Sequence, residues 1–268
     1  MKKTKNEKKK CPICGKYDIP SSDHVPPKCC GNKGKKITYY FFKNSYGKIE
    51  QKETQNGVHF EYICSQCNNS ILGRNLDDCL KAFYNYVIAS NDKNIKWNGN
   101  VEKIVKCIFG HVLATSEYSS CVFDKEMREF ILKNIIPKRI SMYLFYYPYN
   151  AIFTIKDAFP IVYFNKDMHR NYICPEKTVV TCLYFHPFAF IISDKNKFEE
   201  GVDLIQLIET NQNEIILSRD SWINSTNGIQ LPSCWPCMIG DPDEIGTVDA
   251  IVKGKGEYTY SYSTDKSS

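Results

Sequence analysis

Hydrophobic and polar residues alternate with a helical period in the middle of the chain. Apolar side chains recur at three- and four-residue spacing in Val101–Leu113 and Met127–Ile135, and Pro137 stops the second stretch. Another helix is expected to begin at Asn68, and Asn75 is a candidate N-cap for a helix that follows it. The pattern therefore predicts a helical region between two regions of different character.

Runs of aromatic and β-branched residues predict strands on both sides of this helical region. Ile37–Phe42 and Val58–Ile63 are expected strands near the N-terminus. From residue 142 onward, the pattern predicts a mostly antiparallel sheet built from Met142–Tyr147, Ala151–Ile155, Pro160–Phe164, Val179–Ile192 with a break at Pro187, Val202–Ile208 and Glu214–Leu217. The tail after Lys253 is expected to be loosely ordered.

These elements predict an α+β protein with two domains. A chain of 268 residues, of which 43% are hydrophobic, can bury a sizeable core. We expect a flexible basic arm at residues 1–10, a compact module at 11–92, and an α+β domain at 93–268 with two or three helices and a mostly antiparallel sheet. The Asn/Gly-rich segment 91–100 is the expected boundary between the module and the domain.

The beginning of the chain does not look like a secretory signal, because its basic residues lead into Cys11 without an apolar run. No segment reaches the roughly 18 consecutive apolar residues of a membrane span. The 13 cysteines are therefore expected to be reduced, in a cytoplasmic protein without a membrane partner.

Positive charge is concentrated in the first 60 residues, although the net charge of the whole chain is only +5. This segment holds 14 lysines and no arginine against five acidic residues, and the rest of the chain holds 21 basic and 25 acidic residues. Phosphate contacts supply most sequence-independent affinity for nucleic acids, so a nucleic-acid partner is predicted. The candidate contacts are Lys28, Lys33, Lys35 and Lys36. A solubilising tail is the alternative explanation for the first lysine run.

Two Cys-x-x-Cys pairs are the most specific motif of the chain. The first, Cys11 and Cys14, precedes a glycine, and the second, Cys64 and Cys67, stands at the expected strand-to-helix junction. Two separated thiol pairs can close one tetrahedral zinc site, and a helix N-terminus favours the thiolate form. The sequence therefore predicts one structural Zn²⁺ per chain, held by these four cysteines.

Two other cysteine pairs are less specific. Cys29 and Cys30 follow a Pro-Pro-Lys turn, and they are either core thiols or competitors for the zinc. Cys234 and Cys237 form a third x-x-spaced pair without a partner pair. For these two, a redox role, a metal role and an ordinary turn all remain open.

An acidic residue and a histidine, Asp23 and His24, stand side by side between the two zinc pairs. His59 lies five residues before the second pair, and Asn68 directly follows it. Phosphodiester cleavage needs a cation beside the phosphate oxygens and a base whose pKa lies near neutrality. Asp and Asn oxygens suit a hard cation that keeps most of its waters. These residues therefore fit metal-assisted hydrolysis.

Taken in this order, the motifs over residues 11–75 resemble the HNH family of ββα-metal nucleases. The set consists of Cys-x-x-Cys, Asp-His-Val-Pro-Pro, a histidine, and Cys-x-x-Cys-Asn. It is similar to the zinc-containing HNH endonucleases and to the phage junction-resolving endonucleases with a four-cysteine frame. The resemblance implies a zinc-held, treble-clef-like ββα-metal module in about a quarter of the chain.

The resemblance implies a role for each matching residue. Asp23 and Asn68 would hold a catalytic Mg²⁺ or Mn²⁺, and His24 would be the general base. His59 stands at a position that is usually asparagine, and it would orient the base or contact phosphate.

The remaining candidates match the family less well. The family often carries a lysine where this chain has Ile71, and Arg74 would supply the phosphate contact in its place. The other histidines, His111, His169 and His186, fall on apolar segments and are expected to be core or surface residues.

These expectations together predict a metal-dependent HNH endonuclease that hydrolyses phosphodiester bonds, with DNA favoured over RNA. The resemblance also implies a role in phage defence or a mobile element. A homodimer is expected, because one active site per chain would need a second copy for double-strand breaks, or else a partner protein in a defence system. The alternative is a non-catalytic zinc-containing adaptor that only binds nucleic acid. Asp23, His24 and Asn68 favour the enzyme, because binding alone needs none of them.

Overall fold

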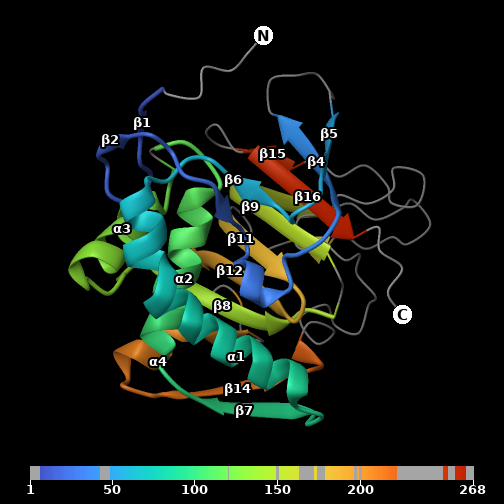
Figure 1. Cartoon of the computed structure of the whole chain (residues 1–268). Coiled ribbons are helices and arrows are strands. Elements are labelled where there is room, and N and C mark those ends of the chain that lie inside the picture. Colours follow the sequence, from blue (N-terminus) through green and yellow to red (C-terminus); the bar gives the residue numbers. More distant parts are fainter. Residues whose placement is uncertain are drawn as a thin grey trace.

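An antiparallel sheet runs through the molecule, and α1, α2 and α3 lie together beside it (Figure 1). The structure is a computed structural model. It describes residues 7–42, 49–119, 121–148, 151–162, 172–173, 179–195, 198, 201–221, 250–252 and 257–263. Within these residues the class is mixed α+β, as the sequence predicts.

The helical elements are η1 (Lys28–Cys30), η2 (Cys67–Asp77), α1 (Asp78–Ala89), α2 (Val101–Ala114), α3 (Asp124–Lys133) and α4 (Leu204–Glu209). The strands are β1 (Lys9–Lys10), β2 (Tyr17–Asp18), β3 (Asp23–His24), β4 (Lys36–Phe42), β5 (Ile49–Thr54), β6 (His59–Phe60), β7 (Asn94–Asn98), β8 (Ile140–Tyr146), β9 (Ala151–Val162), β10 (Tyr172–Ile173), β11 (Val180–Phe185), β12 (Phe188–Asp194), β13 (Val202–Asp203), β14 (Glu214–Ser218), β15 (Ala250–Val252) and β16 (Glu257–Ser263).

The sheet has the strand order β13-β8-β12-β11-β9-β16-β4-β5, and β10 and β15 also pair with β9. All its pairings are antiparallel. The sequence predicts a break at Pro187, and β11 and β12 do turn there. Every residue of β11 is buried, which explains why its sequence is apolar without alternation.

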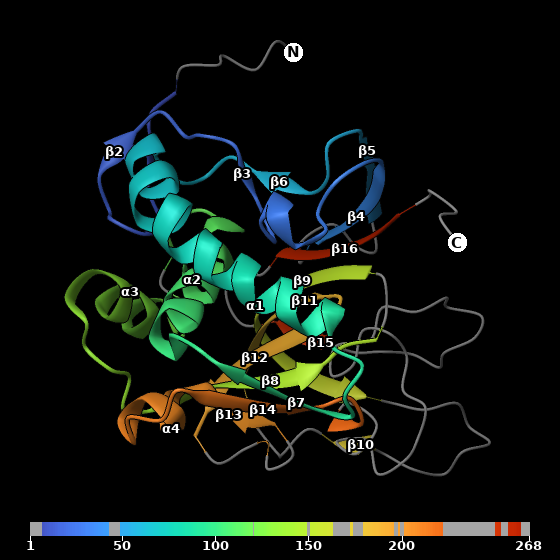
Figure 2. The same ribbon diagram turned by 60° about the horizontal axis from the view of Figure 1, so that its bottom comes forward.

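The hairpin β4–β5 joins the N-terminal region to this sheet. It lies in the sequence between the two cysteine pairs, and β16 connects it to the C-terminal strands (Figure 2). Thr259 of β16 pairs with Tyr40 on one side and with Thr154 on the other. The expectation of a loosely ordered tail after Lys253 is therefore wrong for this strand. The division at residues 92–93 stays a prediction, and the sheet crosses it.

The helices α2 and α3 form where the apolar spacing predicts them. Most of α2 is buried, since η2, α1, α3, α4 and β11 all contact it. The approach of η2 is close at Gly110, where an added Cβ would lie 2.1 Å from Leu72 Cδ2. The absence of a side chain at Gly110 therefore lets Leu72 pack closely against α2.

Several predicted elements differ from the observed ones for identifiable reasons. The segment 91–100 contains strand β7, in which Ile95 and Trp97 are buried while their neighbours are exposed. Most of the strand expected at Val202–Ile208 is helix α4, because the Asp203 carboxylate accepts a hydrogen bond from the Gln206 N–H at 3.0 Å and caps it. The strand expected at Val58–Ile63 is only two residues long.

The helical region after Asn68 consists of two helical parts with a kink between them, as the sequence predicts. Gly73 has non-helical angles (φ −39°, ψ −135°), which separate the first turns of η2 from the part that continues into α1. The side chain of Asn75 does not cap this second part, because its Oδ1 accepts a hydrogen bond from Lys103 Nζ at 2.7 Å. Among the described residues, no helix has the length and apolar character needed to cross a membrane.

Candidate metal centre

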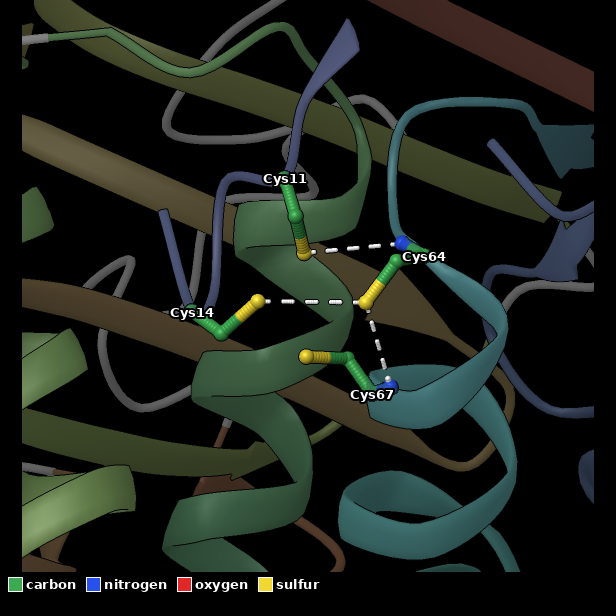
Figure 3. Close-up of side chains that lie close together, drawn as sticks. All are labelled: Cys11, Cys14, Cys64 and Cys67. Atoms are coloured by element: carbon green, nitrogen blue, oxygen red, sulfur yellow. Dashed lines mark hydrogen bonds between the residues drawn. The ribbon is translucent and has the colours of Figure 1, made fainter. Parts of the chain in front are cut away.

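The four predicted zinc ligands converge on one point (Figure 3). Their sulfur atoms all lie within 4.8 Å of one another, and the Cys14 and Cys64 sulfurs are 3.8 Å apart. A tetrahedral site with zinc–sulfur bonds of about 2.3 Å places its sulfurs about 3.8 Å apart. The four cysteines could therefore bind a metal such as zinc.

Backbone N–H groups surround these sulfurs. The N–H of Cys64 points at Cys11 Sγ, and the N–H of Cys67 points at Cys64 Sγ, each at 3.5 Å. Hydrogen bonding with the Cys67 thiol lowers the pKa of Cys11 to about 4, and the same pairing raises the pKa of Cys67. A divalent cation bound here would favour the thiolate form of both cysteines.

The first cysteine pair forms a tight turn that is attached to helix α3. Gly15 closes the turn in the left-handed region (φ +74°), and its N–H donates to Cys11 O at 2.9 Å. Arg128 of α3 donates to Pro12 O at 3.3 Å and stacks on Tyr118, 4.6 Å from the ring centre. Lys9 and Lys10, expected in a flexible arm, form β1 here and pair with β2.

The strands β3 and β6 bring two predicted site residues together. His24 pairs with His59 in register, and the two imidazole ring centres are 5.8 Å apart. His24 Nε2 donates to Asn56 O at 2.9 Å, which leaves Nδ1 as its acceptor nitrogen. Burial lowers the pKa of His24, so its imidazole is neutral at neutral pH.

Asn32, which the sequence analysis did not single out, connects the loop after β3 to β6. Its amide group donates to Pro26 O at 2.7 Å and to Val58 O at 2.8 Å, and its Oδ1 accepts from Val58 N at 2.7 Å. Asn32 is fully buried. Gly57 packs against it with φ +81°, and an added Cβ would lie 2.5 Å from Asn32 Oδ1. These contacts fix the backbone that carries His59.

Asn68 lies in the first turn of η2, where the sequence predicts it. Its amide nitrogen donates to Ser21 Oγ at 3.1 Å and to Ser22 O at 3.0 Å. Both hydrogen bonds use the NH₂ group, so the Oδ1 is left as an acceptor. The side chain therefore lies beside the residue that precedes Asp23.

Asp23 points away from His24, as adjacent residues of a strand do. Its side chain is buried, and its Oδ2 lies 3.1 Å from Nδ1 of the fully buried His111. The other imidazole nitrogen, Nε2, lies 2.9 Å from Asp77 Oδ1. Burial alone would lower the pKa of His111, but Asp23, Cys107 and Asp77 together raise it well above its usual value. The imidazole is therefore cationic between two carboxylates when no metal is bound.

The structure places the predicted lysines in different environments. Lys28 and Lys33 are exposed, Lys35 forms an ion pair with Glu53 at 3.0 Å, and Lys36 is buried. The backbone of Arg74 lies in η2, and its side chain is outside the described part.

The remaining cysteines and histidines have separate locations. Cys29 and Cys30 lie in η1, apart from the four-cysteine cluster, with their sulfurs 3.9 Å from each other. Cys234, Cys237 and His169 fall outside the described residues.

Sequence inspection did not single out Asp77 or Cys107, and it assigned His111 to the core or the surface, of which the structure shows the core. Cys107 and His111 are four residues apart on α2, so they lie on the same face of the helix. That spacing was a visible signal, but the apolar residues around it favoured an ordinary core helix. Asp77 had no signal, because only the packing of η2 against α2 brings it to them.

Comparisons with known proteins give no relative. No protein-family model, no curated protein and no solved structure matches this chain. A functional assignment therefore depends on the residues of the site.

Proposed function

We propose that this chain is a metal-dependent endonuclease of the HNH type that hydrolyses phosphodiester bonds in DNA. The observation that carries the proposal is the placement of His24 against His59 on the β3–β6 pair, with Asn68 bonded to the preceding loop. A strand pair followed by a helix, with a four-cysteine cluster at the junction, is the arrangement that the resemblance implies.

The donor atoms suit a hard cation. Asp23 uses Oδ2 for His111, and Asn68 uses its NH₂ group for the loop, so the Oδ1 of each residue would be the atom that binds the cation. Mg²⁺ and Mn²⁺ prefer such oxygen ligands and keep several waters. When bound, the cation would supply positive charge beside the phosphate oxygens.

His24 would act as the general base. Its Nδ1 would take a proton from water while the water oxygen forms a bond to phosphorus and the bridging P–O bond breaks, and the departing oxygen would take up a proton in turn. The hydrogen bond from Nε2 to Asn56 O fixes the ring and its tautomer. His59 would contact the phosphate or orient His24, and the exposed Lys28 and Lys33 would bind the backbone of the nucleic acid.

The test is cleavage of supercoiled plasmid and of a matched RNA with Mg²⁺ or Mn²⁺. We expect nicking of the plasmid by the wild type, and a loss of about 10²-fold or more in His24→Ala. His186→Ala is the matched control, because His186 lies in the turn between β11 and β12. Equal nicking by wild type and His24→Ala would remove His24 from the mechanism.

One observation favours the adaptor as a second candidate, namely the burial of Asp23 and its pairing with His111. An Asp23 with only a structural role would be compatible with a module that binds nucleic acid without cutting it. The adaptor predicts binding of DNA or RNA in a gel-shift assay, with no cleavage under either metal. Phage defence, a mobile element, and a homodimer or partner protein remain predictions from the sequence.

A further inference from the structure

We propose that Asp77, Cys107 and His111 form a second site for a divalent cation, separate from the four-cysteine cluster. The cation that this site favours is Zn²⁺. The proposal does not depend on nuclease activity. The three ligands do not form a recognised motif in the sequence.

The three side chains offer one oxygen, one sulfur and one nitrogen at short range. All three donor atoms lie within 4.8 Å of one another. Asp77 Oδ1 is 3.4 Å from Cys107 Sγ and 2.9 Å from His111 Nε2. A tetrahedral zinc with bonds of about 2.0–2.3 Å separates such donors by roughly 3.3–3.8 Å. The ligands need only a small outward movement to reach that geometry.

The chemistry of this donor set favours zinc over magnesium. Thiolate and imidazole are ligands for zinc and other borderline or soft cations, whereas Mg²⁺ prefers oxygen. A buried thiol such as Cys107 needs only one hydrogen-bond partner. An aspartate and a histidine on the same side of the thiol are what a zinc site with three protein ligands requires. The site proposed for the catalytic cation, with oxygen donors only, has the opposite preference.

Asp23 gives the arrangement a feature typical of metal sites. A metal-bound histidine usually donates its other ring N–H to a carboxylate, which fixes the ring and raises its basicity. Asp23 Oδ2 accepts from His111 Nδ1 in this way, at 3.1 Å, and leaves Nε2 directed at Asp77 and Cys107. His111 and Asp23 are both buried, so the ring has a single orientation.

Asp77 is the most accessible of the three ligands. His111 and Cys107 are fully buried, but about a quarter of the Asp77 side chain is exposed. Cys29 is not one of the three donors, since its sulfur contacts Asp77 only at the backbone oxygen, at 3.9 Å. Three protein ligands with a fourth open position are a common zinc arrangement.

The competing explanation is a buried ion pair without a metal. In that state His111 is cationic between two carboxylates, and Cys107 is a neutral thiol whose pKa burial raises to about 12. Cation binding would displace a proton from each. The two explanations differ in metal content, which can be measured directly.

The experiment measures zinc per chain by mass spectrometry in the full-length protein, after incubation with Zn²⁺ and removal of the excess. We expect two zinc ions in the wild type and one in Cys107→Ser. The matched control is Cys182→Ser, a buried cysteine of β11 outside both clusters, which should retain two. One zinc in the wild type, or the same content in Cys107→Ser as in the wild type, would overturn the proposal.

Binding of Co²⁺, followed by absorption, provides a second measurement that begins with the wild-type protein. Co²⁺ bound to thiolates absorbs by charge transfer in proportion to the number of sulfur ligands. The wild-type protein should take up Co²⁺ in two phases, one with strong four-sulfur absorption and one with weak single-sulfur absorption. In Asp77→Asn the second phase should weaken at least tenfold in affinity. A single four-sulfur phase in the wild type would also rule the second site out.

Discussion

The two clusters of metal ligands in this molecule are built in opposite ways. The four cysteines come from two tight local motifs, and each pair is already correctly spaced within its own turn. The second cluster takes Asp77 from the end of η2 and Cys107 and His111 from α2, so it exists only when these helices pack. A ligand set made of local pairs is visible in the sequence, and one assembled between elements is not.

The clusters also differ in what holds them together without a cation. The sulfurs of the four-cysteine cluster have weak N–H···S contacts and contacts with one another. His111 has two carboxylate partners, Asp23 and Asp77, which hold it in place in its cationic form. We therefore expect the first cluster to depend on its metal and the second to keep its geometry without one.

The largest effect is expected from Cys64→Ser. Structural zinc contributes apparent free energies of about 10–16 kcal/mol in small zinc modules, so loss of one ligand should release the metal and unfold the N-terminal region. Zinc analysis and hydrogen exchange of residues 11–68 measure this. Cys182→Ser should change neither quantity, and full zinc content in Cys64→Ser would contradict the four-cysteine assignment.

A smaller effect is expected from His111→Ala. Without the imidazolium, Asp23 and Asp77 lose their shared partner, and breaking a buried ion pair typically costs about 3–5 kcal/mol of the free energy of unfolding. Chemical denaturation of metal-free protein measures the change. The double variant His111→Ala/Asp23→Asn should recover part of the loss, because the more buried charge is removed. A loss below about 1 kcal/mol would show that the ion pair does not hold this cluster.

The smallest effect is expected from Gly110→Ala, which acts on the helix contact that brings the second cluster together. The new methyl group would lie 2.1 Å from Leu72 Cδ2, so either the Leu72 side chain or the two helices must shift. Overpacking of this kind costs about 1–3 kcal/mol, reduced by the better helix propensity of alanine.

A double-variant cycle tests the origin of this effect. If the clash with Leu72 is responsible, Leu72→Ala/Gly110→Ala should be less destabilised than the sum of the single variants. Additive changes would place the cause elsewhere. The four-cysteine cluster should keep its zinc throughout, since neither residue touches it.

Local patterns were sufficient for the longer helices, for several strands and for the four-cysteine cluster. Apolar spacing predicted α2 and α3, and the cysteine pairs predicted their own convergence. The strand β7 was missed because its exposed positions are asparagine and lysine, which resemble a loop. The apolar run after Asp203 was predicted as a strand, but it forms α4 because Asp203 caps this helix. Apolar content alone does not distinguish the two structures.

The pairing of distant segments could not be predicted from the sequence. β16 lies between β4 and β9, more than 200 residues from the first of them, and no turn signal or repeat connects them. The direction of Asp23 also depended on tertiary structure, because a two-residue strand has no pattern that states which side faces the core.

The sequence by itself determined the two cysteine pairs and the mixed α+β class, since these follow from spacings and residue types within short stretches of the chain. Only the tertiary structure decided that His111 lies between Asp23 and Asp77, and that Cys107 joins them. The physical reason is the separation along the chain of the residues involved. Spacing within a turn is fixed by backbone geometry, whereas contacts between helices and strands are fixed by how their buried faces fit.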